Sequence, residues 1–248
     1  MVHRSAGWSF HQTDHGWSGP VAGQGMPSAM NARLEGMFEQ AGCRGQLCVQ
    51  SLDGAQEIAV DADKQVVAAS VFKVLVALEA ETQFAECRLD PRERVDLHVA
   101  SRTPGPTGFS LFRDDVDVSL RDLVVAMLTI SDNEATDALL RRVGIETLNA
   151  SAKRLGLACT VITGDLRTTE LDRPRRGLRR LAGHGGLGGS LVGVIRNEIG
   201  VISYPHGRCY VAAVFTQAHR PGQNGAAIDS VIGATAATAV SILSGQST

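Results

Sequence analysis

The alternation of apolar and polar positions predicts a helix near the start of the chain, followed by two strands. From Ser28 onward, apolar residues recur on one helical face, and Gly42 can end that helix. Two short β runs, "GQLCVQSL" and "EIAVDA", then flank Asp53-Gly54. This pair favours a tight hairpin turn in which both residues adopt positive φ. A helix followed by a two-stranded hairpin is therefore expected.

The middle of the chain has the periodicity of helices. Ser70 to Phe84 is apolar enough to be buried on most sides of a helix. Residues 91–118 are rich in Pro, Gly and Asp and predict a long surface excursion. Three helical segments follow from Ser119, which can cap the first of them, and "SDN" separates the first from the second.

The C-terminal part returns to β structure. "VIRNEIGVISYP" and "RCYVAAVFTQ" predict a hairpin around His206-Gly207, and residues 225–243 predict an Ala-rich helix that lies on the sheet. The predicted fold is α+β with αβα layers: one antiparallel sheet built from both chain ends, flanked by the N- and C-terminal helices, with an inserted helical lobe. The expected organisation is a disordered tail (1–27) and one domain (28–248), with sheet parts 28–68 and 184–248 and a shortened lobe 69–183.

Charge and cysteine content exclude several classes of protein. A net charge of −2 gives no long-range attraction to nucleic acid or an anionic membrane, so neither partner is expected. No apolar run approaches the roughly 18 residues of a membrane span, and residues 1–27 lack the apolar middle of a secretion signal. A cytoplasmic monomer is expected, or a periplasmic or secreted one if the start is misassigned. Five cysteines without metal-type spacing predict reduced thiols and no metal or other cofactor.

Ser70 and Lys73 stand three positions apart at the start of an apolar helix. Lysine occurs only at positions 64, 73 and 153, so one within an apolar helix is notable. An amine accepts a hydroxyl proton near pH 7 only where desolvation lowers its pKa, and a buried helix start provides that environment. The helix dipole also leaves N–H groups near Ser70 that can bind an oxyanion. The alternative is a lysine whose stem packs while its amine reaches solvent.

Ser131-Asp132-Asn133 lies between two helical segments about 60 residues later. All three residue types are good helix caps, so a purely structural role is the alternative. Within the lobe, however, this triplet can direct a hydroxyl and an amide toward Ser70 and Lys73.

These two elements resemble the marks of the serine β-lactamase and penicillin-binding-protein superfamily, S-x-x-K, S-D-N and K-T-G in that order. The likeness is greatest to class A β-lactamases. Three segments carry it over about residues 30–165 and 184–243: "VQSLDGAQEIAVDADKQVVAASVFKVLVA", "LVVAMLTISDNEATDALLRRVG" and "VIRNEIGVISYPHGRCYVAAVFT". The resemblance implies an acylated nucleophile at Ser70 and a proton acceptor at Lys73, acting directly or through water. It also implies that Ser131 protonates the leaving nitrogen, Asn133 holds the substrate's side-chain amide and Asp132 fixes the loop.

The third motif is absent in its usual form, because no lysine follows Lys153. The best substitute is "HGGL", in which His184 replaces the cation that attracts the substrate carboxylate and the Leu187 N–H joins the oxyanion hole, with Gly186 beside it. Histidine is largely neutral at pH 7, so Arg196 or a nearby arginine is expected to supply the charge.

The interval before "HGGL" is also unusual. Family members place about 100 residues between S-D-N and the third motif, and this chain has roughly half as many. The arginines between 173 and 180 are interpreted as a solvated loop, with a nucleic-acid patch as the alternative. A deletion or a shifted reading frame within residues 165–195 is a further hypothesis.

The water-activating glutamate of class A enzymes has no clear counterpart. Thr168 falls where this base is expected, and Glu170 is the candidate replacement, with an exposed loop carboxylate as the alternative. Without a base, the acyl-enzyme would form and turnover would stall.

The sequence predicts a serine hydrolase that forms an acyl-enzyme on a lactam, amide or ester carbonyl, most similar to class A β-lactamases. Its expected partner is a small-molecule β-lactam or related acyl compound, with D,D-peptidase and esterase activities as competing possibilities. The alternative from another class is a degenerate homologue that binds a peptidoglycan-like or acyl ligand without turnover.

Overall fold

The computed structural model describes residues 11–13, 16–18, 28–157, 159–167, 195–204, 207–220, 222 and 225–245. They belong to two compact units. Unit 1 comprises residues 1–69 and 190–248, and unit 2 comprises residues 70–189. Each unit has its own apolar core.

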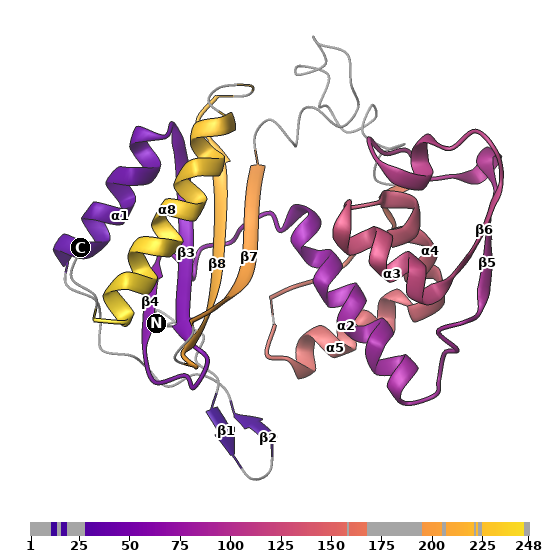
Figure 1. Ribbon diagram of the computed structural model, residues 1–248, viewed down its shortest axis with the longest axis horizontal. Coiled ribbons are helices and arrows are strands. Elements are labelled where there is room, and N and C mark those ends of the chain that lie inside the picture. The colour runs from indigo at the N-terminus through magenta and orange to yellow at the C-terminus, as the bar shows by residue number, and fades with distance from the viewer. Residues whose placement is uncertain are drawn as a thin grey trace, which may run out of the picture. The chain divides into compact units, whose positions relative to one another are not determined.

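Unit 1 is an antiparallel sheet with both of its helices on one face (Figure 1). The strand order is β4-β3-β8-β7. These elements are β3 (Cys43–Ser51), β4 (Glu57–Val60), β7 (Ile195–Ser203), β8 (Cys209–Ala218), α1 (Ser28–Gln40) and α8 (Gly225–Leu243). The sheet therefore takes strands from both ends of the chain, which confirms the predicted fold class. A small hairpin, β1 (His11–Thr13) and β2 (Gly16–Ser18), lies in the segment predicted to lack regular structure.

Alternation along the strands gives the sheet of unit 1 one apolar face. Leu47 on β3 is paired with Val214 on β8, and both are buried in the core formed with α1 and α8. The neighbouring pair, Gln46 and Phe215, points to the other face because successive side chains on a strand alternate.

Helix α8 corrects one expectation. It is long and apolar enough to cross a membrane by length and composition alone, so the statement that no such run exists was wrong. One side of α8, including Ile228 and Ile232, is buried and packs on β8 and β3. The apolar character of this side is what a helix covering a sheet requires.

The turn between β3 and β4 also differs from its prediction. Of the two turn residues, only Gly54 has positive φ (72°), and Asp53 does not. The Asp53 side chain instead accepts a hydrogen bond from the Ala55 N–H (3.0 Å), which stabilises a longer loop. A two-residue turn with positive φ at both positions is therefore not formed.

Unit 2 is a helical bundle that carries a small hairpin on its outside. The helices are α2 (Phe72–Ala85), α3 (Leu120–Thr129), α4 (Asn133–Val143) and α5 (Ile145–Arg154), and the hairpin strands are β5 (Arg94–Leu97) and β6 (Val116–Ser119). Short 3₁₀ turns are η1 (Ala69–Val71), η2 (Val99–Ser101) and η3 (Gly108–Leu111). Residues 91–118 were predicted as a long surface excursion, without strands; the two ends of this stretch pair as β5 and β6 and bury Leu97 and Val118.

Two predicted helix starts in unit 2 are confirmed by their caps. The Ser119 hydroxyl accepts from the Asp122 N–H, and the Asp132 carboxylate accepts from the Ala135 N–H (2.9 Å). The expectation that α2 is buried on most sides is confirmed, because most of its residues are buried or half-buried. One stripe of the helix stays exposed, on which Val74 and Leu78 are 44% and 48% exposed.

Candidate active site

Ser70 and Lys73 stand at the junction between a 3₁₀ turn and helix α2. Ser70 is the middle residue of η1 and is exposed, whereas Lys73 lies in the first turn of α2 and is only 3% exposed. Helix α2 starts without a side-chain cap, so its first N–H groups keep their capacity to bind an anion. The sequence thus places an accessible hydroxyl one turn before a buried amine.

The Lys73 amine is held by the S-D-N segment. Its Nζ donates to the Ser131 carbonyl oxygen (2.6 Å), the Ser131 Oγ (3.0 Å) and the Asn133 Oδ1 (3.0 Å). An ammonium group has three N–H donors, and these three acceptors match them. The alternative of a lysine reaching solvent therefore does not describe this structure.

Burial changes the protonation of this amine. Desolvation lowers the pKa of Lys73 to about 8, against the opposing effect of the Asp132 and Asp137 carboxylates, which raise it. At pH 7 about one tenth of the molecules then hold the free amine, compared with well under one in a thousand for an ordinary lysine. The amine can act as a base near neutral pH, and more effectively above pH 8.

The Ser131 hydroxyl stands between the other two groups. Its Oγ lies 2.8 Å from the Ser70 Oγ and 3.0 Å from the Lys73 Nζ. The Lys73 Nζ donates to the Ser131 Oγ, which in turn donates to the Ser70 Oγ, so the three groups form one connected path along which a proton can move without water.

The backbone is strained beside the Ser70 hydroxyl and at Ser131 itself. Ala69 and Ser131 have φ values of 45° and 56°, in the left-handed region that non-glycine residues seldom adopt. Such conformations cost on the order of 1–3 kcal/mol and persist where surrounding contacts hold them. Their position next to the two hydroxyls is typical of functional sites.

Asn133 has a fixed orientation. Its Oδ1 accepts from Lys73, and its Nδ2 donates to the Pro104 carbonyl oxygen (3.2 Å). A flipped amide would place its NH₂ group against the ammonium and its oxygen against the carbonyl, so the chemistry of the two partners settles the orientation. The predicted role of Asn133 in holding a substrate amide stays a prediction.

Asp132 and Asp137 tie the site to two neighbouring segments. Asp132 is fully buried and accepts from the Phe109 N–H (2.6 Å) as well as capping α4. Asp137 accepts from the Thr103 Oγ1 (2.7 Å) and from the N–H groups of Leu166 and Arg167 (2.8 and 2.9 Å). Burial raises the pKa of Asp137 despite these hydrogen bonds. The expected role of Asp132 in fixing the loop agrees with these contacts.

Known proteins resemble this chain in both sequence and fold. The sequence pattern that defines the beta-lactamase enzyme family matches residues 29–184. The chain belongs to this family. Among curated proteins, the "Beta-lactamase regulatory protein BlaB" of Streptomyces cacaoi is 30% identical over 107 residues, which make up 43% of this chain and 34% of that protein. The matched segment thus spans about a third of that relative.

Solved structures show the same fold. A beta-lactamase from Sphaerobacter thermophilus DSM 20745 matches with a TM-score of 0.70 and 21% identity over 88% of this chain and 98% of that one. PBP-A, as an acyl-enzyme complex with penicillin G, matches with a TM-score of 0.68 and 18% identity over 88% and 97% of the two chains. An ancestral class A beta-lactamase gives a TM-score of 0.66 and 18% identity over 86% and 99%.

The remaining predicted site residues of this beta-lactamase-family chain belong to unit 1 or lie outside the described residues. Arg196 belongs to unit 1, at the start of β7, where its Nη1 donates to both carboxylate oxygens of Asp229 (2.5 and 2.6 Å). Its role toward a substrate carboxylate stays a prediction. Glu170, His184, Gly186 and Leu187 lie outside the described residues, so their predicted roles also stay predictions.

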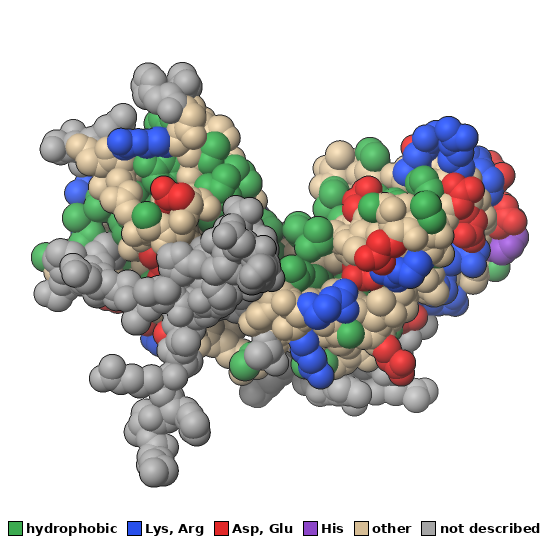
Figure 2. Space-filling model, turned by 90° about the horizontal axis from the view of Figure 1, so that it is seen from below, with side chains coloured by type: hydrophobic (Ala, Val, Ile, Leu, Met, Phe, Trp, Pro, Cys, Tyr) green, Lys and Arg blue, Asp and Glu red, His purple; other side chains and the backbone are tan. Residues whose placement is uncertain are grey.

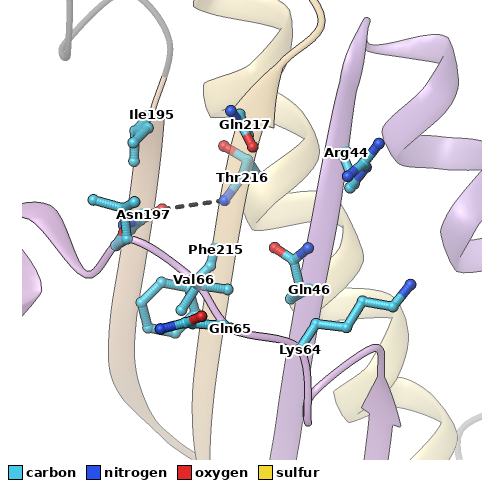
Figure 3. Close-up of a pocket in the computed structure, with 11 residues that line it drawn as sticks. Arg44, Gln46, Lys64, Gln65, Val66, Ile195, Asn197, Phe215, Thr216 and Gln217 are labelled. Carbon is cyan, nitrogen blue, oxygen red and sulfur yellow. Dashed lines mark hydrogen bonds between the residues drawn. The ribbon is translucent and has the colours of Figure 1, made fainter. Parts of the chain in front are cut away.

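Unit 1 contains a hollow of about 310 Å³ on the sheet face opposite its helices (Figure 3). Phe215 and Gln46 belong to its lining, and residues 64–67 run across it. Asn197 anchors that crossing segment, because its Nδ2 donates to the carbonyl oxygens of Val67 (2.9 Å) and Ala68 (3.1 Å). Neither Phe215 nor Gln46 nor Asn197 was singled out from the sequence.

The described surface carries both signs of charge. Figure 2 shows acidic and basic side chains interspersed over the face of unit 2 that it presents. Some of the charged side chains of unit 2 form ion pairs, such as Arg94–Asp117 (2.8 Å). Mixed charge of this kind gives no extended field of one sign.

A buried carboxylate that the sequence did not single out lies on α2, the helix that also carries Lys73. Glu79 on α2 is 2% exposed and accepts from Gln83 (2.9 Å), Arg88 (3.3 Å) and Ser151. Burial alone would raise the pKa of Glu79, but the hydrogen bonds from Ser151, Gln83 and Arg88 outweigh it and hold the pKa below its ordinary value. The available signal was a glutamate on the apolar side of a helix, which requires partners once buried.

Proposed function

We propose that this chain is a serine hydrolase that forms an acyl-enzyme at Ser70 on a lactam, amide or ester carbonyl. The observation that carries the proposal is the continuous path of hydrogen bonds from Ser70 Oγ through Ser131 Oγ to Lys73 Nζ. Membership of the beta-lactamase enzyme family supports it, as does the shared fold with PBP-A, a mutant of which was solved as an acyl-enzyme complex with penicillin G.

The proposed acylation step begins in molecules whose Lys73 amine is free. Ser70 Oγ attacks the carbonyl carbon while its proton moves to Ser131 Oγ, and the Ser131 proton moves to Lys73 Nζ. The tetrahedral intermediate then expels the lactam nitrogen or the ester oxygen, which takes a proton back from Lys73 through Ser131. One bond forms at the carbonyl carbon, one breaks, and the amine returns to its free state.

A second function is favoured by two specific observations. The chain has no lysine beyond Lys153, so the cation of the third motif is absent, and the matched curated relative is a regulatory protein. A protein that becomes acylated and turns over slowly, or that binds an acyl compound without reacting, is consistent with both.

Incubation with a fluorescent penicillin, followed by intact-mass analysis over time, tests the proposal. The expected result is a covalent adduct that raises the protein mass by the mass of the penicillin. The adduct should be absent from Ser70→Ala and present in the matched control Ser230→Ala, a serine on the exposed side of α8. Loss of the adduct with time indicates a hydrolase, and a persistent adduct indicates a stalled acylator. No adduct with penicillins, cephalosporins or activated esters would refute the acyl-enzyme and favour a binding protein.

A further inference from the structure

Four residues of the loop 103–109 hydrogen-bond to the S-D-N segment or to the residue on either side of it. The Thr107 Oγ1 donates to the Ile130 carbonyl oxygen (2.9 Å), and the Phe109 N–H donates to Asp132 (2.6 Å). The Pro104 carbonyl accepts from Asn133, and the Thr103 N–H donates to Glu134 (2.5 Å). Ser131 thus lies within a segment that is held on both of its sides.

Gly108 allows the closest of these contacts. It has a φ of 57°, and a Cβ added there would lie 2.0 Å from Asp132 Oδ2 and 2.7 Å from Ile130 Cδ1. No side chain other than hydrogen fits this position without displacing the residues on either side of Ser131.

The strain at Ser131 requires such support. A left-handed residue without a glycine's freedom relaxes unless its neighbours fix it. Here the residue before Ser131 is fixed by a hydrogen bond from Thr107, and the residue after it is fixed by a hydrogen bond from the Phe109 N–H. If either contact loosened, the Ser131 hydroxyl would leave its place between Ser70 and Lys73.

We propose that the 103–109 loop, with Gly108 and Thr107 as positioning residues, sets the geometry of the proton path by holding Ser131 in its strained conformation. The inference rests on the proposed function for its catalytic consequence. Its structural part, the placement of Ser131 and Asn133 around Lys73, is independent of whether the chain turns over a substrate.

The first test compares acylation rates in matched variants. Gly108→Ala is expected to slow acylation of Ser70 by about 100-fold, the loss associated with misplacement of a catalytic group by about 1 Å. Gly156→Ala is its control, because Gly156 also has positive φ (80°) but has no neighbour where a Cβ would lie. Thr107→Val is expected to slow acylation about tenfold. Thr107→Ser, which keeps the hydroxyl, is expected to be acylated at the rate of the wild-type protein.

The second test observes Lys73 directly. With three lysines in the chain, ¹³Cε-lysine labelling gives three signals, and the signal that disappears in Lys73→Arg belongs to Lys73. In Gly108→Ala and Thr107→Val the titration midpoint of Lys73 is expected to move upward, toward that of a solvated lysine, while Lys64 and Lys153 stay unchanged. The charged groups acting on Lys73 in the described structure are Asp132 and Asp137, and neither is substituted.

The two tests separate the two proposals. If wild type forms no adduct but the Lys73 midpoint moves in the loop variants, the proposed function fails and the positioning role stands. If the midpoint stays unchanged in both variants, or if Gly108→Ala and Gly156→Ala lose acylation equally and Thr107→Val equals Thr107→Ser, the positioning role is refuted. Should Gly108→Ala fail to fold, the Thr107 pair decides alone.

Discussion

The hydroxyl oxygens of Ser70 and Ser131 lie 2.8 Å apart, although Ser70 belongs to the turn before α2 and Ser131 to the loop between α3 and α4. Ser131 in turn contacts the Lys73 amine, so the three groups form one connected path.

Acylation is expected to depend on pH through Lys73. Because burial lowers the pKa of Lys73 to about 8, the free amine, and with it the acylation rate, should rise about tenfold per pH unit below 8 and level off above it. Stopped-flow measurement of the acylation rate between pH 6 and 9.5 checks this, with circular dichroism confirming that the fold is constant. A flat profile would contradict Lys73 as the base.

Substitutions at Ser131 are expected to separate strain from catalysis. Ser131→Ala and Ser131→Gly both remove the hydroxyl and should lower the acylation rate by about 10²-fold or more. Glycine tolerates the φ of 56° at this position, so Ser131→Gly should be more stable than Ser131→Ala by about 1 kcal/mol. Urea denaturation and acylation rates measured on the same samples test both parts. Equal stabilities would show that the backbone carries no strain.

Glu79 is expected to stabilise the fold at neutral pH. Its pKa is lower in the folded protein than in the unfolded chain. The stability it contributes is therefore present above the unfolded pKa and is lost as pH falls through the folded pKa. Glu79→Gln should lower the free energy of unfolding by about 2 kcal/mol at pH 7 and by less at acidic pH. Glu81→Gln, on the exposed side of α2, is the control, and a pH-independent loss would contradict this account.

Arg196 is expected to improve the binding of substrates that carry a carboxylate and to leave the binding of neutral substrates unchanged. If it supplies the missing cation, Arg196→Ala should raise KM about tenfold for a penicillin, which carries a carboxylate, and leave KM unchanged for a neutral activated ester. Asp229→Asn weakens the ion pair that orients Arg196 and should have a smaller effect in the same direction. An equal rise for both substrates would show that the pair serves the fold of unit 1 instead.

The sequence was sufficient to predict the sheet, the helical lobe and the two motifs whose side chains meet in unit 2. Ser70, Lys73, Ser131 and Asn133 could be named in advance because S-x-x-K and S-D-N place particular chemistry at particular points. The supporting contacts could not be named. Gly108 and Thr107 sit in a Pro- and Gly-rich stretch that reads as a surface loop, and their function depends on contacts with residues about 23 positions away.

Two errors have identifiable physical causes. The hairpin of β5 and β6 is formed by strands of four residues each, too short for alternation to be visible beside the surrounding turn residues. The Asp53-Gly54 turn was misjudged because the Asp53 side chain accepts a hydrogen bond from the Ala55 N–H, which competes with the two-residue turn. In the first case each strand is held by a partner far along the chain, and in the second a local hydrogen bond outweighs the local turn preference.

The bonds from Asn197 to Val67 and Ala68 have one further consequence. They fix residues 67 and 68 to strand β7, so the chain leaves the sheet of unit 1 at a defined point and in a defined direction rather than through a loose linker.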